Sequence, residues 1–316
     1  MKTLLNRFFP LGVLCFLIVM SIGQLDAAPI FGIESIDSGG GPNSQAPTTL
    51  YTFDSTNGVF SGLSNIGVIR RGASELHTDG LAYSESYGLF AFELNGGRSR
   101  LIHVNTANAQ ATTVGAFVSG DLRGAAFSGR KLLALDSQTN RLMTVDVSTG
   151  SIRSSMHLKL GKATYNLGNS VDLAVKDGVV YIVEGGRVGS GTIVTGNGVN
   201  GTNIFSVDLN TGLLTLLKQD LVNEPLVNQR LVGHGAAFEA GSSLLHVSEM
   251  NMGDGLFHYD VSNNYARTGL VSEVVPGTNS GRGDLASDSS PVPEPATLGL
   301  MGASLVTLAI FLRRKA

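Results

Sequence analysis

The chain is poor in three residue classes, and each shortage excludes a class of protein. Its 316 residues include no tryptophan, a single cysteine at position 15, and only 15% charged residues, against about 25% in typical soluble domains. One cysteine rules out an intramolecular disulfide framework. The formal net charge is -3, and no block of lysine and arginine interrupts the body. We therefore expect no nucleic-acid partner, since such proteins carry a concentrated basic surface.

Glycine and apolar residues are what the chain has in abundance. Glycine occurs 41 times, and 42% of the residues are hydrophobic. This apolar content is enough to bury a core, which excludes a wholly disordered chain. The many glycines indicate short strands joined by tight turns. We therefore expect an all-β body.

The first 27 residues have the pattern of an export signal. Lys2 and Arg7 form a basic start, residues 8–22 are almost wholly apolar, and Leu25-Asp26-Ala27 supplies small residues for cleavage. This order of features predicts a signal peptide over residues 1–27. A retained membrane helix is the alternative, although the apolar run is short for one.

The C-terminal end contains a second apolar segment with polar borders. A proline-rich linker, residues 289–295, precedes the uncharged residues 296–312, and the chain closes with a basic tail, residues 313–316. Seventeen helical residues, at about 1.5 Å each, reach across a thin bilayer core. We therefore predict a transmembrane helix at 296–312 with its tail in the cytoplasm, following the positive-inside rule.

This arrangement resembles the PEP-CTERM sorting signal of Gram-negative bacteria. The resemblance rests on Pro293-Glu294-Pro295, the short apolar segment, and the basic residues Arg313, Arg314 and Lys315. It implies recognition by an exosortase, a membrane transpeptidase-like protease. It also implies a surface or extracellular-matrix protein of an exopolysaccharide-producing organism. A permanent tail anchor has the same geometry, and either reading places residues 28–288 outside the cytoplasm.

The body contains a repeat of about 45 residues, a length typical of propeller blades. Its clearest marker is an alanine that follows a small or acidic residue and an apolar residue, at Ala82, Ala126, Ala174, Ala237 and Ala286. Short alternating or apolar runs follow each marker, and none has a sustained helical period. We interpret the alanines as structural, since the innermost strands of a propeller converge on its axis.

The repeat predicts a five-bladed β-propeller over residues 28–288, built from four-stranded antiparallel blades. The first unit starts in its second strand and the last alanine motif has no blade after it, so we expect the C-terminus to supply the first strand of blade 1. The body also resembles bacterial propeller repeats with a Val-Asp-x-x-Thr-Gly turn, here residues 145–150 and 207–212. The absence of tryptophan disfavours tryptophan-aspartate repeats.

Acidic residues end the expected second strands, all of which open onto one end of the propeller, which we call the mouth. They are Glu34, Glu93, Asp136, Glu184 and Glu249. The first strands begin at the mouth with further polar residues: His77, Asp79, Asp121, Arg123, Asp172, His234, Arg282 and Asp284. A ring of carboxylates could hold Ca²⁺ or bind hydroxyl-rich sugars. Alternatively, these acids only serve the turns, and His77 and His234 are ordinary polar residues beside them.

No enzyme signature occurs in the body. The sequence has no Gly-x-Ser-x-Gly elbow, no His-Glu-x-x-His helix and no P-loop. We therefore expect a noncatalytic binding or structural protein of the cell surface, with an exosortase as partner and exopolysaccharide or other surface proteins as ligands. The alternative hypothesis is a Ca²⁺-dependent propeller hydrolase of the glycosidase or lactonase type, because paired carboxylates can hydrolyse glycosides.

Overall fold

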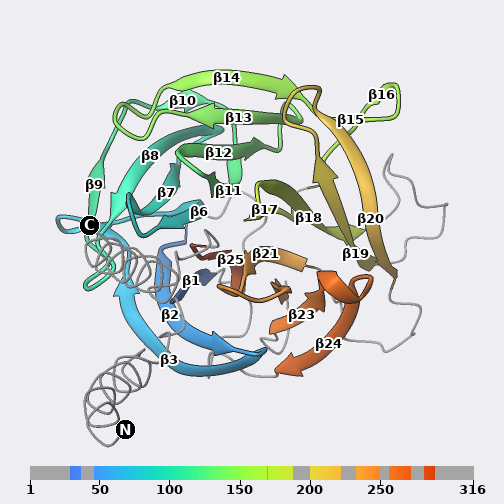
Figure 1. Cartoon of the computed structure of the whole chain (residues 1–316). Helices are drawn as coiled ribbons and strands as arrows, with labels where there is room; N and C mark the ends of the chain where they lie inside the picture. The colour runs from blue at the N-terminus through green and yellow to red at the C-terminus, as the bar shows by residue number, and fades with distance from the viewer. Residues whose placement is uncertain are drawn as a thin grey trace, which may run out of the picture. The chain divides into compact units, whose positions relative to one another are not determined.

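Five β-sheets arranged around one axis make up the body of the protein. The computed structural model describes residues 29–36, 46–168, 170–187, 200–221, 233–249, 256–271 and 281–288. Within them the sheets form a five-bladed β-propeller, as Figure 1 shows. The predicted fold class is therefore confirmed. The predicted signal peptide and C-terminal helix lie outside the described residues, and the domain boundaries stay predictions.

Each blade is an antiparallel meander whose first strand lies nearest the axis. Blade 1 consists of β25 (Gly281–Ala286), β1 (Ile30–Ile36), β2 (Thr48–Thr56) and β3 (Val59–Val68). Blade 2 consists of β6 (Thr78–Ser84), β7 (Gly88–Leu94), β8 (Arg98–Val104), β9 (Ala111–Thr113) and β10 (Val118–Ser119). Blade 3 consists of β11 (Leu122–Ser128), β12 (Lys131–Asp136), β13 (Arg141–Val145) and β14 (Ile152–His157).

The last two blades follow the same plan. Blade 4 consists of β17 (Ser170–Lys176), β18 (Val179–Arg187), β19 (Asn200–Val207) and β20 (Leu213–Leu221). Blade 5 consists of β21 (Gly233–Phe238), β22 (Leu244–Glu249), β23 (Leu256–Asp260) and β24 (Ala266–Val271), with the 3₁₀ turn η2 (Val261–Asn263) before β24.

Short strands between blades add to the predicted architecture. The hairpin β4 (Arg70–Arg71) and β5 (Ser74–Glu75) leads from blade 1 into blade 2. Strands β15 (Lys159–Leu160) and β16 (Ala163–Thr164) extend the outer edge of blade 4, where β15 runs parallel to β20. These excursions cover part of the sheet edges that a four-stranded blade exposes.

The C-terminus closes the ring by supplying the innermost strand of blade 1. Strand β25 pairs antiparallel with β1, with Ile33 opposite Asp284 and Phe31 opposite Ala286. The five innermost strands also touch in sequence around the axis, β6 to β11, β17, β21, β25 and back to β6. The prediction that the first strand of blade 1 comes from the C-terminus is therefore confirmed.

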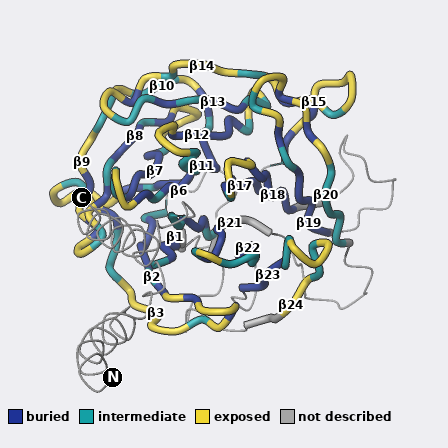
Figure 2. The backbone as a smooth tube through the Cα atoms, in the orientation of Figure 1, coloured by how far each residue is buried: buried dark blue, intermediate teal, exposed yellow. Residues whose placement is uncertain are grey.

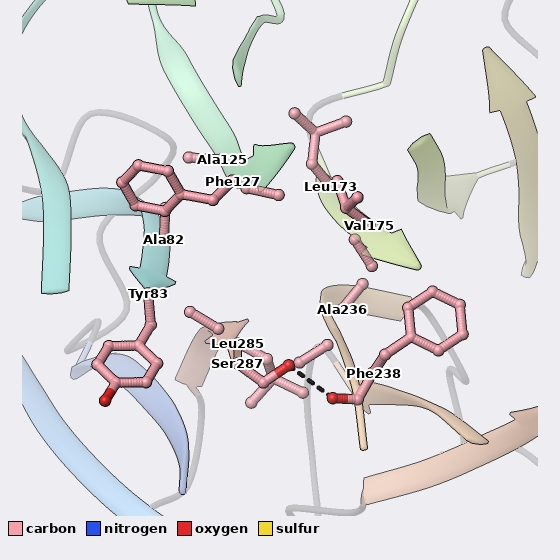
Figure 3. Close-up of a pocket in the computed structure, with 14 residues that line it drawn as sticks. Ala82, Tyr83, Ala125, Phe127, Leu173, Val175, Ala236, Phe238, Leu285 and Ser287 are labelled. Atoms are coloured by element: carbon pink, nitrogen blue, oxygen red, sulfur yellow. Dashed lines mark hydrogen bonds between the residues drawn. The ribbon is translucent and has the colours of Figure 1, made fainter. Parts of the chain in front are cut away.

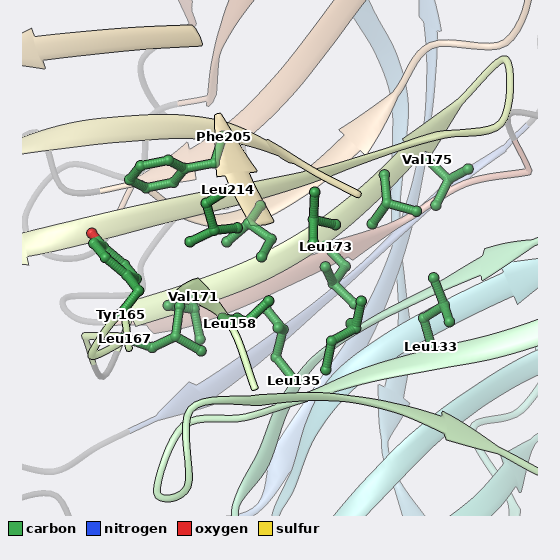
Figure 4. Packing of buried hydrophobic residues seen from close by; sticks show 14 residues of the cluster. Leu133, Leu135, Leu158, Tyr165, Leu167, Val171, Leu173, Val175, Phe205 and Leu214 are labelled. Carbon is green, nitrogen blue, oxygen red and sulfur yellow. The ribbon is translucent and has the colours of Figure 1, made fainter. Parts of the chain in front are cut away.

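Apolar side chains packed between neighbouring blades hold the ring together. The inner strands are buried and the outer strands, such as β3 and β14, are largely exposed (Figure 2). Figure 4 shows the core between blades 3 and 4, where Leu133, Leu173 and Phe205 are buried together. Similar clusters fill the other four seams between blades. Burial of each such side chain contributes about 1.5–3 kcal/mol.

The inner strands approach one another so closely that their sequence is limited to small residues. A Cβ atom on Gly124 would lie 2.7 Å from Cα of Asp172, and one on Gly235 would lie 2.3 Å from the carbonyl oxygen of Gly283. Ala82, Ala174 and the other marker alanines lie further along the same inner strands, where they surround the axis. This crowding is the physical reason for the repeated alanine motif.

The Val-Asp-x-x-Thr-Gly segments form the expected turns between third and fourth strands. The carboxylate of Asp146 accepts from the backbone N–H of Ser148 and of Thr149, both at 2.9 Å. Gly150 takes a φ of 68°, a left-handed conformation that glycine adopts without strain. Asp208 and Gly212 repeat this arrangement in blade 4.

Candidate functional site

The structure describes both the backbone and the side chain of three of the five predicted mouth carboxylates. Glu93 lies near the end of β7, Asp136 ends β12, and Glu184 lies in β18. The backbones of Glu34, Glu249 and His234 lie in β1, β22 and β21, but their side chains are outside the described residues. His77 precedes β6, and its Nδ1 lies 3.0 Å from the carbonyl oxygen of Ala46.

Glu93 is held by two arginines, one in the hairpin before its blade and one in the neighbouring strand β8. Its Oε2 accepts from Nη1 of Arg71 at 2.5 Å and from Nη2 and Nε of Arg100 at 2.7 and 3.0 Å. Arg100 in turn lies over the ring of Phe117, with its guanidinium carbon 4.2 Å from the ring centroid. Glu93 is 8% exposed, so its charge is balanced inside the fold.

Asp136 organises the turn that follows β12. Its carboxylate accepts from Oγ1 of Thr139 at 2.5 Å and from the backbone N–H of Gln138 at 3.0 Å. It also accepts from the backbone N–H of Asp121 at 3.2 Å, which connects the turn to the start of β11. A carboxylate used in this way caps backbone donors as an Asx turn does.

Glu184 is buried under a tyrosine of the loop before β17. The hydroxyl of Tyr165 donates to its Oε2 at 2.5 Å, and the backbone N–H of Gly168 donates to its Oε1 at 2.7 Å. The side-chain amide of Asn203 adds a third contact at 3.3 Å. Burial raises the pKa of Glu184, and these hydrogen bonds oppose that rise only in part.

The three carboxylates therefore have separate partners and share no common centre. Among the residues that the structure describes, no group of three His, Cys, Asp or Glu side chains is placed to hold a metal ion. The proposed Ca²⁺ ring would have to be completed by Glu34 and Glu249, whose side chains lie outside that description. The described part of the mouth is consistent with structural use of its acids.

The structure instead brings together the acids that begin the first strands. Asp172 and Asp284 are 0% and 1% exposed, and each carboxyl group lies close enough to affect the ionisation of the other. Burial raises the pKa of both, and repulsion from Asp172 adds to this for Asp284. Burial and proximity therefore both favour the protonated form over the charged form in this pair.

Each member of this axial pair also ties two blades together. Oδ2 of Asp172 accepts from the backbone N–H of Ala236 at 2.6 Å, and Oδ2 of Asp284 accepts from that of Leu81 at 2.8 Å. Both donors belong to the innermost strand of another blade. The sequence indicated these acids only as strand starts, because their pairing depends on strands more than 100 residues apart.

Arg123 completes the axial group on the side of blades 2 and 3. Its Nε donates to Asp121 at 2.8 Å, and its Nη1 lies 4.0 Å from the carboxylate of Asp79. Arg123 is 8% exposed, so a buried cation lies close to Asp79, Asp121 and Asp284.

The opposite end of the inner strands forms a small apolar depression. Figure 3 shows its lining, in which alanines such as Ala82, Ala125 and Ala236 surround the axis. Beside it, Oγ of Ser287 donates to the carbonyl oxygen of Phe238 at 2.6 Å. The depression has no titratable group suited to catalysis among its lining residues apart from Tyr83.

Comparison with known sequence motifs decides the nature of the C-terminal segment. Residues 291–315 match the PEP-CTERM protein-sorting motif. The chain carries a PEP-CTERM sorting signal. The match covers the residues that suggested the resemblance, including Pro293, Glu294, Pro295, Arg313, Arg314 and Lys315.

The PEP-CTERM signal marks an exported protein that an exosortase sorts at the membrane. The motif lies outside the described residues, so its structure adds nothing to this statement. Within the described residues, no helix is long and apolar enough to cross a membrane. The predicted helix at 296–312 lies beyond them.

Solved structures resemble the body of this chain at low identity. Glutaminyl cyclase of Myxococcus xanthus is 14% identical, with 73% of this chain and 85% of that chain covered and a TM-score of 0.41. A chain of a nidogen/laminin complex is 12% identical, covering 83% and 99%, with a TM-score of 0.46. TolB of Acinetobacter baumannii is 13% identical, covering 82% and 66%, with a TM-score of 0.44. No curated protein matches the chain.

Proposed function

We propose that the protein works at the cell surface or in the extracellular matrix as a noncatalytic binding or structural component linked to exopolysaccharide. The sorting signal at residues 291–315 carries this proposal, because it commits the chain to export and exosortase sorting. The signal begins five residues after β25, the strand that closes the propeller. What is delivered to the surface is therefore a closed, rigid ring.

The use of the mouth carboxylates supports a noncatalytic role. A glycosidase needs one carboxyl group free to donate a proton and another free to attack or to activate water. Glu93 is occupied by two arginines, and Asp136 is occupied by turn donors. Glu184 is 5% exposed beneath Tyr165. Such side chains stabilise a scaffold better than they serve a substrate.

Sorting is tested by changing the signal and the sorting enzyme separately. The full chain would be expressed in a Gram-negative host with and without its exosortase, and as a Glu294→Ala variant. In the complete host we expect surface accumulation of the unchanged chain and of the control variant, but none for Glu294→Ala and none without the exosortase. A matched control is Glu75→Ala, which removes an exposed glutamate from the body. Equal surface display in all four cases would overturn sorting through this signal.

Ligand binding needs a second experiment with its own probe. The full chain in detergent micelles would be sedimented with purified exopolysaccharide of the same host, and soluble sugar and lactone products would be measured. Cosedimentation without product supports the proposal. Release of reducing sugar or opening of a lactone would overturn the noncatalytic role, whereas absence of cosedimentation would overturn the exopolysaccharide link.

A further inference from the structure

The seam between blades 5 and 1, where the ring closes, contains a buried pair of histidines. His246 in β22 and His258 in β23 are direct cross-strand partners, with ring centroids 5.6 Å apart. They are 0% and 7% exposed. Phe60 of blade 1 packs against both rings, at centroid distances of 4.8 and 6.3 Å. The two imidazoles therefore lie inside an otherwise apolar interface.

Little in this interface can stabilise charge on the rings. Nδ1 of His246 and Nδ1 of His258 are buried without a hydrogen-bond partner. The strands β1, β2 and β25 contribute the apolar Ile30, Phe53 and Leu285 to the core of this seam, against which Phe60 also packs. Among the described residues, Glu239 is the one charged group that faces the pair, with its Oε2 3.3 Å from Nε2 of His246.

Glu239 is already engaged in holding blade 1. Its carboxylate accepts from Oγ of Ser55 at 2.7 Å and from the backbone N–H of Asn57 and Gly58 at 2.6 and 2.9 Å. Burial alone would raise the pKa of Glu239, but the contact with His246 and hydrogen bonds from Gly58 and Ser55 lower it to about 2. The carboxylate thus stays ionised and fastens the β2–β3 hairpin to blade 5.

The other blades do not place two histidines at this cross-strand position. The equivalent pairs, in blade order from 1 to 4, are Phe31 with Thr52, Phe90 with His103, Leu133 with Thr144, and Tyr181 with Ser206. Their first member is a large apolar or aromatic residue, which the seam needs for packing. Among these five pairs, only that of blade 5 has a histidine as its first member.

We propose that the His246 and His258 pair is an acid-sensitive latch on the closing seam of the propeller. In the closed seam both rings pack as aromatic side chains. Protonation of His258 would place a cation beside His246 in an apolar interface, whereas the hydrated ring in an opened seam accepts a proton freely.

The direction of the pH effect follows from the state of His258. Burial and the neighbouring His246 lower the pKa of His258, and Glu239 opposes this only in part. The opened seam therefore binds a proton that the closed seam excludes. Closure is fully stabilised above about pH 6.5, the ordinary value for histidine, and weakens as the pH falls below it.

Amide exchange at the seam measures this opening directly. The backbone N–H groups of Asn57 and Gly58 are protected by Glu239 only while the seam is closed. Hydrogen exchange of the full chain in detergent micelles, corrected for intrinsic rates, would be compared at pH 7.5 and 5.0. We expect protection of these two amides to fall by up to about 30-fold at pH 5.0. The N–H of Gly150 in blade 3 provides an internal reference.

Matched variants separate the latch from general acid sensitivity. His258→Thr introduces the threonine that blades 1 and 3 have at this position. In this variant, protection of the Asn57 and Gly58 amides should fall by no more than about 3-fold from pH 7.5 to pH 5.0. His103→Thr makes the same change in blade 2, where one histidine lies beside Phe90, and should leave the fall at the seam unchanged. If His258→Thr does not fold, His258→Ser introduces the residue that blade 4 has at this position, Ser206. The latch would be overturned if amide protection in the unchanged chain did not change with pH. It would also be overturned if a folded His258 variant lost as much protection at pH 5.0 as the unchanged chain.

Discussion

Gly235→Ala is expected to destabilise the propeller strongly although it adds only one methyl group. The new Cβ would lie 2.3 Å from the carbonyl oxygen of Gly283 and 2.7 Å from the backbone nitrogen of Leu285. Both atoms belong to the backbone of β25, which cannot turn aside as a side chain can. Ser248 also bridges the two strands, accepting from Gly235 N–H at 2.8 Å and donating to the Gly283 carbonyl at 2.5 Å.

The size of the effect follows from two costs. Overpacking of a tight interior costs about 1–3 kcal/mol. Leu285 of β25 is buried, with 3% of its surface exposed, and displacement of the strand would expose part of this side chain. Complete exposure of a buried leucine costs about 1.5–3 kcal/mol. We therefore expect a loss of about 3–5 kcal/mol in the free energy of unfolding. At about 2–4 °C per kcal/mol, a loss of about 3 kcal/mol lowers Tm by about 6–12 °C.

Chemical unfolding of the full chain in detergent micelles would measure this loss. Since the chain has no tryptophan but seven tyrosines, circular dichroism is the appropriate signal. Gly241→Ala is the control, because Gly241 has a φ of 70° and open space around its Cβ position, so only a conformational cost of about 1–2 kcal/mol applies. A Gly235→Ala variant no less stable than the control would refute the view that axial crowding dictates small residues.

Three further predictions concern the buried acids. Burial raises the pKa of Glu184, so its stabilising contribution is complete below about pH 4.3 and is lost as the pH rises. Glu184→Gln does not titrate, and the difference in Tm between this variant and the unchanged chain should therefore shift in favour of the variant from pH 4 to pH 7. Asp284→Ala should cost about 1–3 kcal/mol in unfolding experiments because it leaves the buried N–H of Leu81 unpaired, whereas Asp284→Asn keeps an acceptor and should cost less. Arg100→Ala removes two donors from Glu93 and should cost about 1–3 kcal/mol, and a Tm equal to that of the unchanged chain would contradict this.

The fold could be predicted because the need for small residues near the axis leaves a short sequence motif in each repeat. The axis allows only small residues at one point of every inner strand, so Ala82, Ala174 and Ala286 recur with the blades. The hairpin at residues 70–75 could not be predicted in this way. Its position is set by contacts with residues distant in sequence, such as the bridge between Arg70 and Gln110, and two-residue strands leave no periodic pattern.

For the candidate site, the sequence predicted where the acidic residues lie in the fold but not which groups they bind. Strand ends placed Glu93 and Glu184 at the mouth, but their partners Arg71 and Tyr165 come from irregular connections about 20 residues earlier in the chain. Nothing in the periodicity distinguishes a carboxylate that is free from one that such a connection covers. The same holds for His246 and His258, because their pairing depends on strand register.

Ring closure connects the fold to sorting, because the strand that completes blade 1 is also the last strand before the signal. Beyond β25, Ser287 donates to the Phe238 carbonyl at 2.6 Å and the carboxylate of Asp288 accepts from the N–H of Glu85 at 2.7 Å. These contacts tie the end of the body to blades 5 and 2. A force that pulls on residues 291–315 would therefore reach these side-chain contacts before the pairing of β25 with β1. In this chain the contacts of Ser287 and Asp288 thus lie between the sorting signal and the strand pairing that closes the ring.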